Sequence, residues 1–338
     1  MAAARPDPTV RVTIDDVARA AGVSRQTVSR AMNGKAEISA ATRSRVLATI
    51  EALDYRPSMF ARGMRTQRAG TLALVLSDIA NPFFPAVARG VFDGARALGF
   101  TVVVHNTDAN AGRELAATRE IVEHGADGVI GFFEALDDAE LAALGERLPL
   151  VVADRRAPGP RVASVSSDFA AGTRAALEHL FARGHRHLGM LDGTVGVEHL
   201  RRRAFVAGLA EHGHPDPDRH VVAAPPTVTG GAAAASGLLA AHPDTTAIFA
   251  FNDLMALGAV RELQRRGHRV PADCAVVGYD DVTLAALVDP ALTTVHTDKY
   301  ELGRTLVDVL GRTLDPDAGA DAVEHRLLPA SLVVRDSA

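Results

Sequence analysis

The sequence predicts a small all-α head followed by a large α/β body. Two observations point to this division: charge is distributed unevenly along the chain, and the hydrophobic pattern changes near residue 70. Residues 1–68 hold 12 lysine or arginine residues and 6 acidic residues, a formal charge of +6, whereas the remaining 270 residues hold 24 and 35, a charge of −11. The net charge of −5 therefore conceals a basic segment, and we expect the two parts to have different partners.

The head contains short helices with recognisable start and stop signals. Thr13 can cap a first helix that ends before Gly22, and Ser24 can cap a second helix that ends at Gly34. Ser39 can open a third helix, whose hydrophobic residues recur at helical spacing. Two short helices joined by a glycine turn and supported by a third describe a helix-turn-helix.

The second helix is expected to enter the major groove of DNA with its N-terminal half against base edges. Arg30 can form two hydrogen bonds with guanine and Gln26 can do so with adenine, while Arg25 can contact either a base or a phosphate. Hydroxyl and amide side chains on the same segment suit phosphates, which position a protein without reading sequence. These residues are Ser24, Thr27, Ser29 and Asn33. The alternative is a helical bundle that does not bind DNA.

From Gly70 onward, apolar runs of strand length alternate with segments of helical spacing. The runs lie at residues 72–76, 102–104, 128–131, 150–153, 187–191, 247–250 and 275–278. Near-continuous apolar strands alternating with helices imply parallel sheets that are covered on both faces. The number of runs fits two doubly wound lobes better than one.

Polar residues at the ends of these runs are candidate ligand contacts, because open α/β sheets bind ligands beyond the carboxyl ends of their strands. Residues 78–84 follow the first run and Asp154 follows the fourth. Asn252 and Asp280 follow the last two runs. Arg201 lies in a run of arginines just before Phe205. If the topology is correct, all of them face one cleft.

The head segment 13–30 resembles the N-terminal signature of the lactose/galactose-repressor family of transcriptional regulators. Further family motifs follow in the same order at residues 53–57, 78–84, 250–258, 277–281 and 331–335. The resemblance covers essentially the whole chain. It implies a ligand-responsive regulator, most often a repressor, that binds a palindromic DNA operator as a homodimer. It also implies a periplasmic-binding-protein-like core whose two lobes exchange strands.

The resemblance divides the chain into a DNA-binding domain (1–57), a hinge helix with linker (58–69) and an effector-binding and dimerisation core (70–338). Within the core, the N-lobe is expected to comprise about residues 70–166 and 297–325. The C-lobe is expected to comprise about residues 167–296 and 326–338.

The hinge segment departs from the family pattern. The family's hinge helix folds on operator DNA and inserts a leucine into the minor groove, and Met64 occupies that position here. Gly63 lowers the helix propensity by up to about 1 kcal/mol relative to alanine, so we expect a hinge that orders less readily. Arg62 and Arg65 would add phosphate contacts, whether the segment is a hinge helix or a plain linker.

The resemblance also implies an effector pocket. Its expected lining residues are Phe83, Phe84, Asp154, Arg201, Asn252 and Asp280. Such a set suits a sugar or another polyol, because the polar groups bond hydroxyls and an aromatic face stacks on a ring. Phe83 could equally be a core residue. Family members often have an aromatic residue in the segment at 225–228, and this chain has no tryptophan and three tyrosines, so we expect a thin aromatic platform.

Other function classes lack their sequence signals. The chain has no Gly-rich phosphate loop, nucleophile elbow or zinc-helix motif, so we expect no enzyme. His185 and His187 have no further ligands nearby in sequence, so we expect neither a metal nor a cofactor. The alternative to a regulator is a cytosolic carbohydrate-binding module or enzyme whose N-terminal helices contact another protein.

The surroundings and the assembly can also be predicted. No signal peptide or bilayer-length apolar run is visible, and the single cysteine, Cys274, fits a reducing cytosol, so we expect a cytoplasmic protein without membrane contact. No leucine-heptad tail follows the last family motif, so we expect a dimer. Effector binding would reorient the lobes and change the cost of hinge folding, and the roles of inducer and corepressor both stay open.

Overall fold

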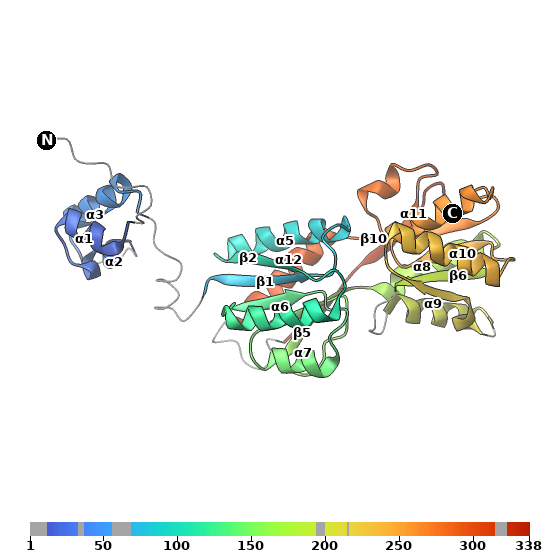
Figure 1. The fold of residues 1–338 in the computed structure, drawn as a ribbon, viewed down its shortest axis with the longest axis horizontal. Coiled ribbons are helices and arrows are strands. Elements are labelled where there is room, and N and C mark those ends of the chain that lie inside the picture. Colours follow the sequence, from blue (N-terminus) through green and yellow to red (C-terminus); the bar gives the residue numbers. More distant parts are fainter. Residues whose placement is uncertain (1–11, 33–36, 56–68, 194–199, 215, 315–322) are drawn as a thin grey trace. The chain divides into compact units, whose positions relative to one another are not determined.

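The computed structural model describes residues 12–32, 37–55, 69–193, 200–214, 216–314 and 323–338 (Figure 1). The chain separates into two compact units, Met1–Ala69 and Gly70–Ala338, which we call the head and the body. The predictions for Asn33, Arg62, Gly63, Met64 and Arg65 lie outside the described residues.

The head consists of α1 (Ile14–Ala21), α2 (Arg25–Met32) and α3 (Ala40–Ala52). Thr13 and Asp16 form a reciprocal capping box at the start of α1, and Gly22 ends that helix in the left-handed conformation at φ 62°. The backbone N–H of Thr27 donates to Ser24 Oγ at 3.2 Å, and that of Thr42 donates to Ser39 Oγ at the same distance. The signals at Thr13, Gly22, Ser24 and Ser39 therefore operate as predicted, and the helix end predicted at Gly34 lies outside the described residues.

A small core holds the three head helices together. Its buried residues are Val17, Ala18, Ala21, Val28, Ala31, Val46 and Tyr55. Because Val28 and Ala31 turn the inner face of α2 into this core, the polar side chains of that helix lie on its other faces.

The N-lobe of the body is a parallel six-stranded sheet with the strand order β11-β5-β4-β3-β1-β2. Its strands are β1 (Thr71–Leu76), β2 (Thr101–Asn106), β3 (Gly128–Gly131), β4 (Leu150–Ala153), β5 (Val162–Ser167) and β11 (His325–Leu328). Its helices are α5 (Phe83–Ala97), α6 (Ala111–Glu123), α7 (Asp138–Gly145) and α12 (Lys299–Thr313). Separate hydrophobic clusters cover the two faces of the sheet, as expected for a doubly wound lobe.

The C-lobe repeats this plan with the strand order β12-β10-β9-β8-β6-β7, in which β12 alone runs antiparallel to its neighbour. Its strands are β6 (Leu188–Gly193), β7 (Val221–Ala224), β8 (Ala247–Ala250), β9 (Ala275–Asp280), β10 (Thr293–Thr297) and β12 (Ala330–Val333). Its helices are α8 (Phe169–Ala182), α9 (Leu200–Glu211), α10 (Val228–Ala241) and α11 (Asp253–Arg265), with short 3-10 turns at Pro217–His220 and Thr283–Ala286.

In the described part of the body, the chain crosses between the lobes three times, after Ser167, after Thr297 and between Leu328 and Ala330. The last crossing lies three residues beyond the boundary expected at 325–326. The reason is that β11 pairs in parallel with β5 as far as Leu328, which lies opposite Ser167.

Helices α5 and α12 pack with their backbones in contact at two glycines, on the same face of the N-lobe sheet (Figure 1). A Cβ atom on Gly90 would lie 2.2 Å from the carbonyl oxygen of Tyr300, and one on Gly303 would lie 2.2 Å from that of Val87. This crossing therefore requires glycine on both helices. None of the helices in the described part of the chain is long and apolar enough to cross a membrane.

Candidate functional site

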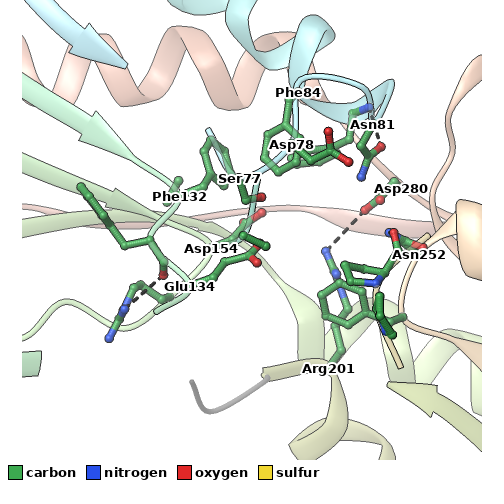
Figure 2. Close-up of a pocket in the computed structure, with 18 of the residues that line it drawn as sticks. Ser77, Asp78, Asn81, Phe84, Phe132, Glu134, Asp154, Arg201, Asn252 and Asp280 are labelled. Atoms are coloured by element: carbon green, nitrogen blue, oxygen red, sulfur yellow. Dashed lines mark hydrogen bonds and ion pairs between the residues drawn. The ribbon is translucent and has the colours of Figure 1, made fainter. Parts of the chain in front are cut away.

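A cavity of about 310 Å³ lies between the two lobes of the body (Figure 2). Residues from both lobes line it, and they include every effector-pocket residue expected from the sequence. These are Phe83, Phe84, Asp154, Arg201, Asn252 and Asp280. They meet because β1, β4, β8 and β9 all end at this cleft, as the strand-end rule predicts.

Two of the carboxylates sit on unusual backbone. Asp154 has a φ of 54° and Asp280 has a φ of 104°, both on the positive side that residues with a Cβ rarely adopt. Such a conformation costs of order 1–3 kcal/mol and persists where the surroundings impose it, often at ligand sites. At Asp154, the N–H of Ser167 donates to Oδ1 at 3.2 Å and helps to hold the turn.

Arg201 of α9 is the central cation of the cavity. Its guanidinium carbon lies 4.6, 4.3 and 4.5 Å from the ring centroids of Phe169, Phe251 and Tyr279. Its Nη2 donates to Asp280 Oδ1 at 3.4 Å. Nε is buried with no hydrogen-bond partner among the described residues, so it remains available to a ligand.

Burial raises the pKa of the carboxyl groups around Arg201. The pKa of Asp280 rises to about 6, although the charges of Arg201 and Lys299 oppose the shift. The pKa of Asp154 also rises through burial, against the charge of Arg201 and the hydrogen bond from the Ser167 backbone. Near pH 6, Asp280 can therefore change between accepting and donating a hydrogen bond.

Asn252 is a site candidate whose polar atoms already have partners in the protein. Its Oδ1 accepts from the N–H of Met255 at 2.9 Å and caps α11, and its Nδ2 donates to the carbonyl oxygen of Pro226 at 3.2 Å. The side chain fixes the segment at 225–227 against the cavity. A direct ligand contact for Asn252 stays a prediction.

Lys299 contacts both a residue that lines the cavity and the crossing between the lobes after Thr297. Lys299, the first residue of α12, donates from Nζ to the carbonyl oxygen of Asp280, to that of Asp281 at 3.2 Å and to that of Thr297 at 3.0 Å. Asp280 ends β9 and Thr297 ends β10, both in the C-lobe, whereas α12 belongs to the N-lobe. The ammonium group of an N-lobe helix residue thus binds backbone carbonyl groups at the ends of two C-lobe strands.

In the head, the expected base-reading residues lie on the outer faces of α2. Arg25 and Gln26 are exposed and Arg30 is partly exposed. Both arginines form ion pairs at the surface: Arg25 Nε lies 3.1 Å from Asp15 Oδ1, and Arg30 Nε lies 3.1 Å from Glu37 Oε2. Phosphates or base edges can replace these carboxylates at little cost.

Known proteins resemble both units. Residues 13–58 match the family described as bacterial regulatory proteins, lacI family, and residues 177–338 match the periplasmic binding protein-like domain. Catabolite control protein A of Priestia megaterium is 31% identical over 325 residues, covering 94% of this chain and 98% of that protein. The ribose operon repressor of Halalkalibacterium halodurans is 34% identical over 327 residues, covering 96% of each chain. This chain belongs to the lacI family.

Solved structures agree with this membership. The lac repressor dimer bound to operator and an anti-inducer aligns with a TM-score of 0.84 at 29% identity, over 97% of this chain and 99% of that one. A CelR–cellobiose complex aligns with a TM-score of 0.72 at 30% identity, over 97% and 100%. The predicted fold class and the resemblance to this family are confirmed, and the chain is a DNA-binding transcriptional regulator.

More phenylalanines line the cavity than the two expected from the sequence, although most of these rings are largely buried. The expectation of a thin aromatic platform stays a prediction. The lining rings are those of Phe83, Phe84, Phe132, Phe133, Phe169 and Phe251. Those of Phe83, Phe84 and Phe132 pack edge to face with centroids 5.2–5.9 Å apart. Counting tyrosine and tryptophan in one segment misses rings that folding collects from several strand ends.

Sequence reasoning also missed two polar residues on the N-lobe side, Ser77 and Glu134. Glu134 follows β3 and so obeys the same strand-end rule as Asp154. Two phenylalanines between the strand and Glu134 prolong the apolar run and obscured the position. His185 and His187, considered as metal ligands, instead bond Thr246 Oγ1 at 3.1 Å and Asp244 Oδ2 at 2.8 Å.

Proposed function

We propose that this chain is a dimeric repressor that binds a palindromic operator through its head, and that a polyhydroxylated effector in the cleft controls this binding. The observation that carries the proposal is the cavity, whose walls come from two separate lobes. A ligand that contacts both walls stabilises one arrangement of the lobes over another, which is the requirement for allosteric control. The cellobiose complex of a structural relative supports a sugar-like effector.

DNA recognition is assigned to α2. Arg25, Gln26 and Arg30 read bases, because they are the long polar side chains on its exposed faces. Phosphate contacts are assigned to Ser24, Thr27 and Ser29, and to Asn33, Arg62 and Arg65 beyond the described residues, with Met64 as the minor-groove wedge. Two symmetry-related heads then read two half-sites.

Effector recognition is assigned to the two walls of the cavity. Phenylalanine rings cover the apolar face of a pyranose or similar ring, while Asp154, Asp280 and Arg201 bond its hydroxyls. Asn252 holds the C-lobe rim in place. In this role the protein works by binding alone, in the cytoplasm where its operator lies.

The decisive experiment first isolates the operator by selecting bound fragments from random DNA with the full chain. Operator affinity is then measured by fluorescence anisotropy with and without the effector found by a thermal-shift screen. Wild-type protein should change its operator affinity on effector addition, by tenfold or more at a coupling of about 1.4 kcal/mol. Asp280→Ala should still bind the operator and lose the response, and Asp280→Asn, which keeps the shape, should behave in the same way.

Two outcomes would contradict the proposal. One is selection of no preferred DNA sequence by the folded full chain. The other is an effector that binds the cavity, as judged by loss of binding in Asp280→Asn, without changing operator affinity. Sedimentation of the full chain on operator DNA should show a dimer per palindrome.

A further inference from the structure

The N-lobe wall of the cavity gathers carboxylates. Asp78 follows β1, Glu134 follows β3 and Asp154 follows β4, and Figure 2 shows all three on the same side as Ser77, opposite Arg201. Each is placed there by the same strand-end geometry. The wall therefore places three acidic groups beside one cavity, where partial burial strengthens their repulsion.

The two cations among the described lining residues form their hydrogen bonds with other groups. Arg155 donates from Nη1 to the carbonyl oxygens of Phe133 and Leu136 at 3.1 and 3.0 Å, and from Nη2 to Asp138 at 2.7 Å. Arg201 is enclosed by three rings and pairs with Asp280 on the opposite wall. Neither guanidinium forms a hydrogen bond with a carboxylate of the N-lobe wall among the contacts of the described residues.

Glu134 is the clearest unsatisfied group on this wall. Its Oε2 is buried with no hydrogen-bond partner among the described residues. Burial raises its pKa, the negative charges of Glu114 and Asp78 add to the rise, and a hydrogen bond with Ser77 opposes it together with Arg201. A buried carboxylate oxygen without a donor is costly, so this position favours a ligand that supplies one.

Aromatic rings complete the same wall. Phe84 and Phe132 lie beside Ser77 and Asp78 in Figure 2, with their ring centroids 5.2 Å apart. Ring faces attract cations, and the cavity already shows this chemistry around the guanidinium of Arg201. Carboxylates together with ring faces form a site that suits an ammonium group.

We propose that the effector carries a protonated amine in addition to its hydroxyl groups, and that the amine lies against Glu134, Asp78 and Asp154. This inference rests on the proposed function, since it names the chemical class of the effector for the same cavity. An amino sugar or an aminocyclitol meets the description. A phosphorylated sugar does not, because its anion would add negative charge beside three carboxyl groups.

The opposite wall accepts the rest of such a ligand. The free Nε of Arg201 can donate to a hydroxyl, and Asp280 can accept from one. The ligand would thus present its cation to the N-lobe and its hydroxyls to the C-lobe. Both ends are then needed to draw the lobes together.

The test is a matched ligand series on the full chain by isothermal titration calorimetry. Glucosamine is compared with glucose, N-acetylglucosamine and glucose 6-phosphate, and the galactose and mannose counterparts complete the panel. In at least one series, the free amine should bind about tenfold or more tighter than its neutral parent and its N-acetyl form, the ratio that one charge-assisted hydrogen bond gives. The phosphate should show no binding.

A pair of variants tests whether the preference for the amine comes from the carboxylates on the N-lobe side of the cavity. Glu134→Gln removes the charge but keeps the shape and the ability to bond Ser77, so the preference for the amine should fall about tenfold. Glu178→Gln is the matched control, because Glu178 is exposed on α8 and lies outside the cavity lining. It should keep the full preference.

Three results would overturn the inference: a neutral or phosphorylated sugar that binds as tightly as the amine of its series, a preference unchanged in folded Glu134→Gln, or a panel in which no amino sugar binds. These outcomes differ from failure of the proposed function. If a neutral sugar binds best and alters operator affinity, the repressor proposal stands and the proposal of an amine-bearing effector fails. If an amino sugar binds best without changing operator affinity, the amine proposal stands and the proposal of effector control fails.

Discussion

Two arginine–carboxylate pairs, one in the head and one in the body, use the same chemistry in opposite ways. In the head, Arg30 Nε lies 3.1 Å from Glu37 Oε2, and the two side chains are 41% and 61% exposed. In the body, Arg201 Nη2 lies 3.4 Å from Asp280 Oδ1, and the side chains are 9% and 5% exposed. Water screens the first pair, which can therefore be exchanged for DNA. The second pair is longer, yet opening it leaves a buried charge.

A third carboxylate, that of Asp253, extends this comparison, because it is buried and forms no ion pair with any described residue. Asp253 accepts from the N–H of Val282 at 2.8 Å and from Thr294 Oγ1 at 2.5 Å. Burial and then the charge of Asp280 raise its pKa to about 8. The carboxylates of Glu37, Asp280 and Asp253 thus form a series from exposed and ion-paired to buried without an ion pair among the described residues. The predictions below begin with Asp253, where the largest effect is expected, and end with Glu37.

Asp253→Asn should produce the largest change, in the pH dependence of stability. Because the folded pKa lies above the unfolded value, Asp253 favours folding at low pH. Its contribution is lost as the pH rises from about 4 to about 8, by up to about 1.4 kcal/mol per pH unit. Urea unfolding of the full chain between pH 5 and pH 8 should show a smaller downward slope in the variant. Equal slopes in the two proteins would refute the burial argument.

Arg201→Met should lower the free energy of unfolding by about 3 kcal/mol at pH 8, because Asp280 is left buried and unpaired. The loss should be smaller at pH 5. The pKa of Asp280 is about 6 with the arginine present and rises further without it, so the carboxyl is neutral at the lower pH. Urea titrations at both values measure this difference. A loss that does not depend on pH would mean that ring packing, and not charge, is what Arg201 supplies.

Arg30→Ala should weaken specific operator binding by about 1–3 kcal/mol for each lost two-pronged base contact, and should leave effector affinity unchanged. Anisotropy titrations on the selected operator and on scrambled DNA separate specific from non-specific binding. Arg45→Ala, an exposed change on α3, serves as the charge-matched control. If both variants lose affinity equally, Arg30 contributes only its charge.

Glu37→Gln should have the smallest effect. It removes the exposed partner of Arg30, and such pairs stabilise a protein by about 0.5 kcal/mol or less. Thermal unfolding should hardly change, while operator affinity should rise slightly because Arg30 no longer exchanges one carboxylate for DNA. A fall in operator affinity would show that the carboxylate orients Arg30 toward its base.

Local signals made much of this molecule predictable. Thr13, Gly22, Ser24 and Ser39 act within four residues of their own position, so helix boundaries in the head can be read directly. The strand-end rule is almost as local, since it requires only that a strand be recognised. The strand-end rule predicts that Asp154 and other lining residues share one cavity without any knowledge of the distances between them.

Features that depend on distant pairing were harder to predict. β11 alternates between exposed and partly buried residues and lacks an apolar run, so only its pairing with β5 reveals that it belongs to the N-lobe. Glu134 was not recognised as a strand-end residue because Phe132 and Phe133 extend the apolar run beyond the end of β3. The phenylalanines that line the cavity come from several segments between residues 83 and 251, and no single segment contains enough of them to indicate an aromatic surface.

The contact made by Lys299 explains why this position is a lysine in a chain whose other cations are almost all arginines. The chain carries 34 arginines and only two lysines, Lys35 and Lys299. Three carbonyl oxygens converge on Nζ of Lys299, and a compact ammonium can meet them from one point, whereas a planar guanidinium spreads its hydrogens over a fork. Rotation of one lobe against the other must therefore either carry these three hydrogen bonds along or break them, and arginine could not substitute for lysine at this joint.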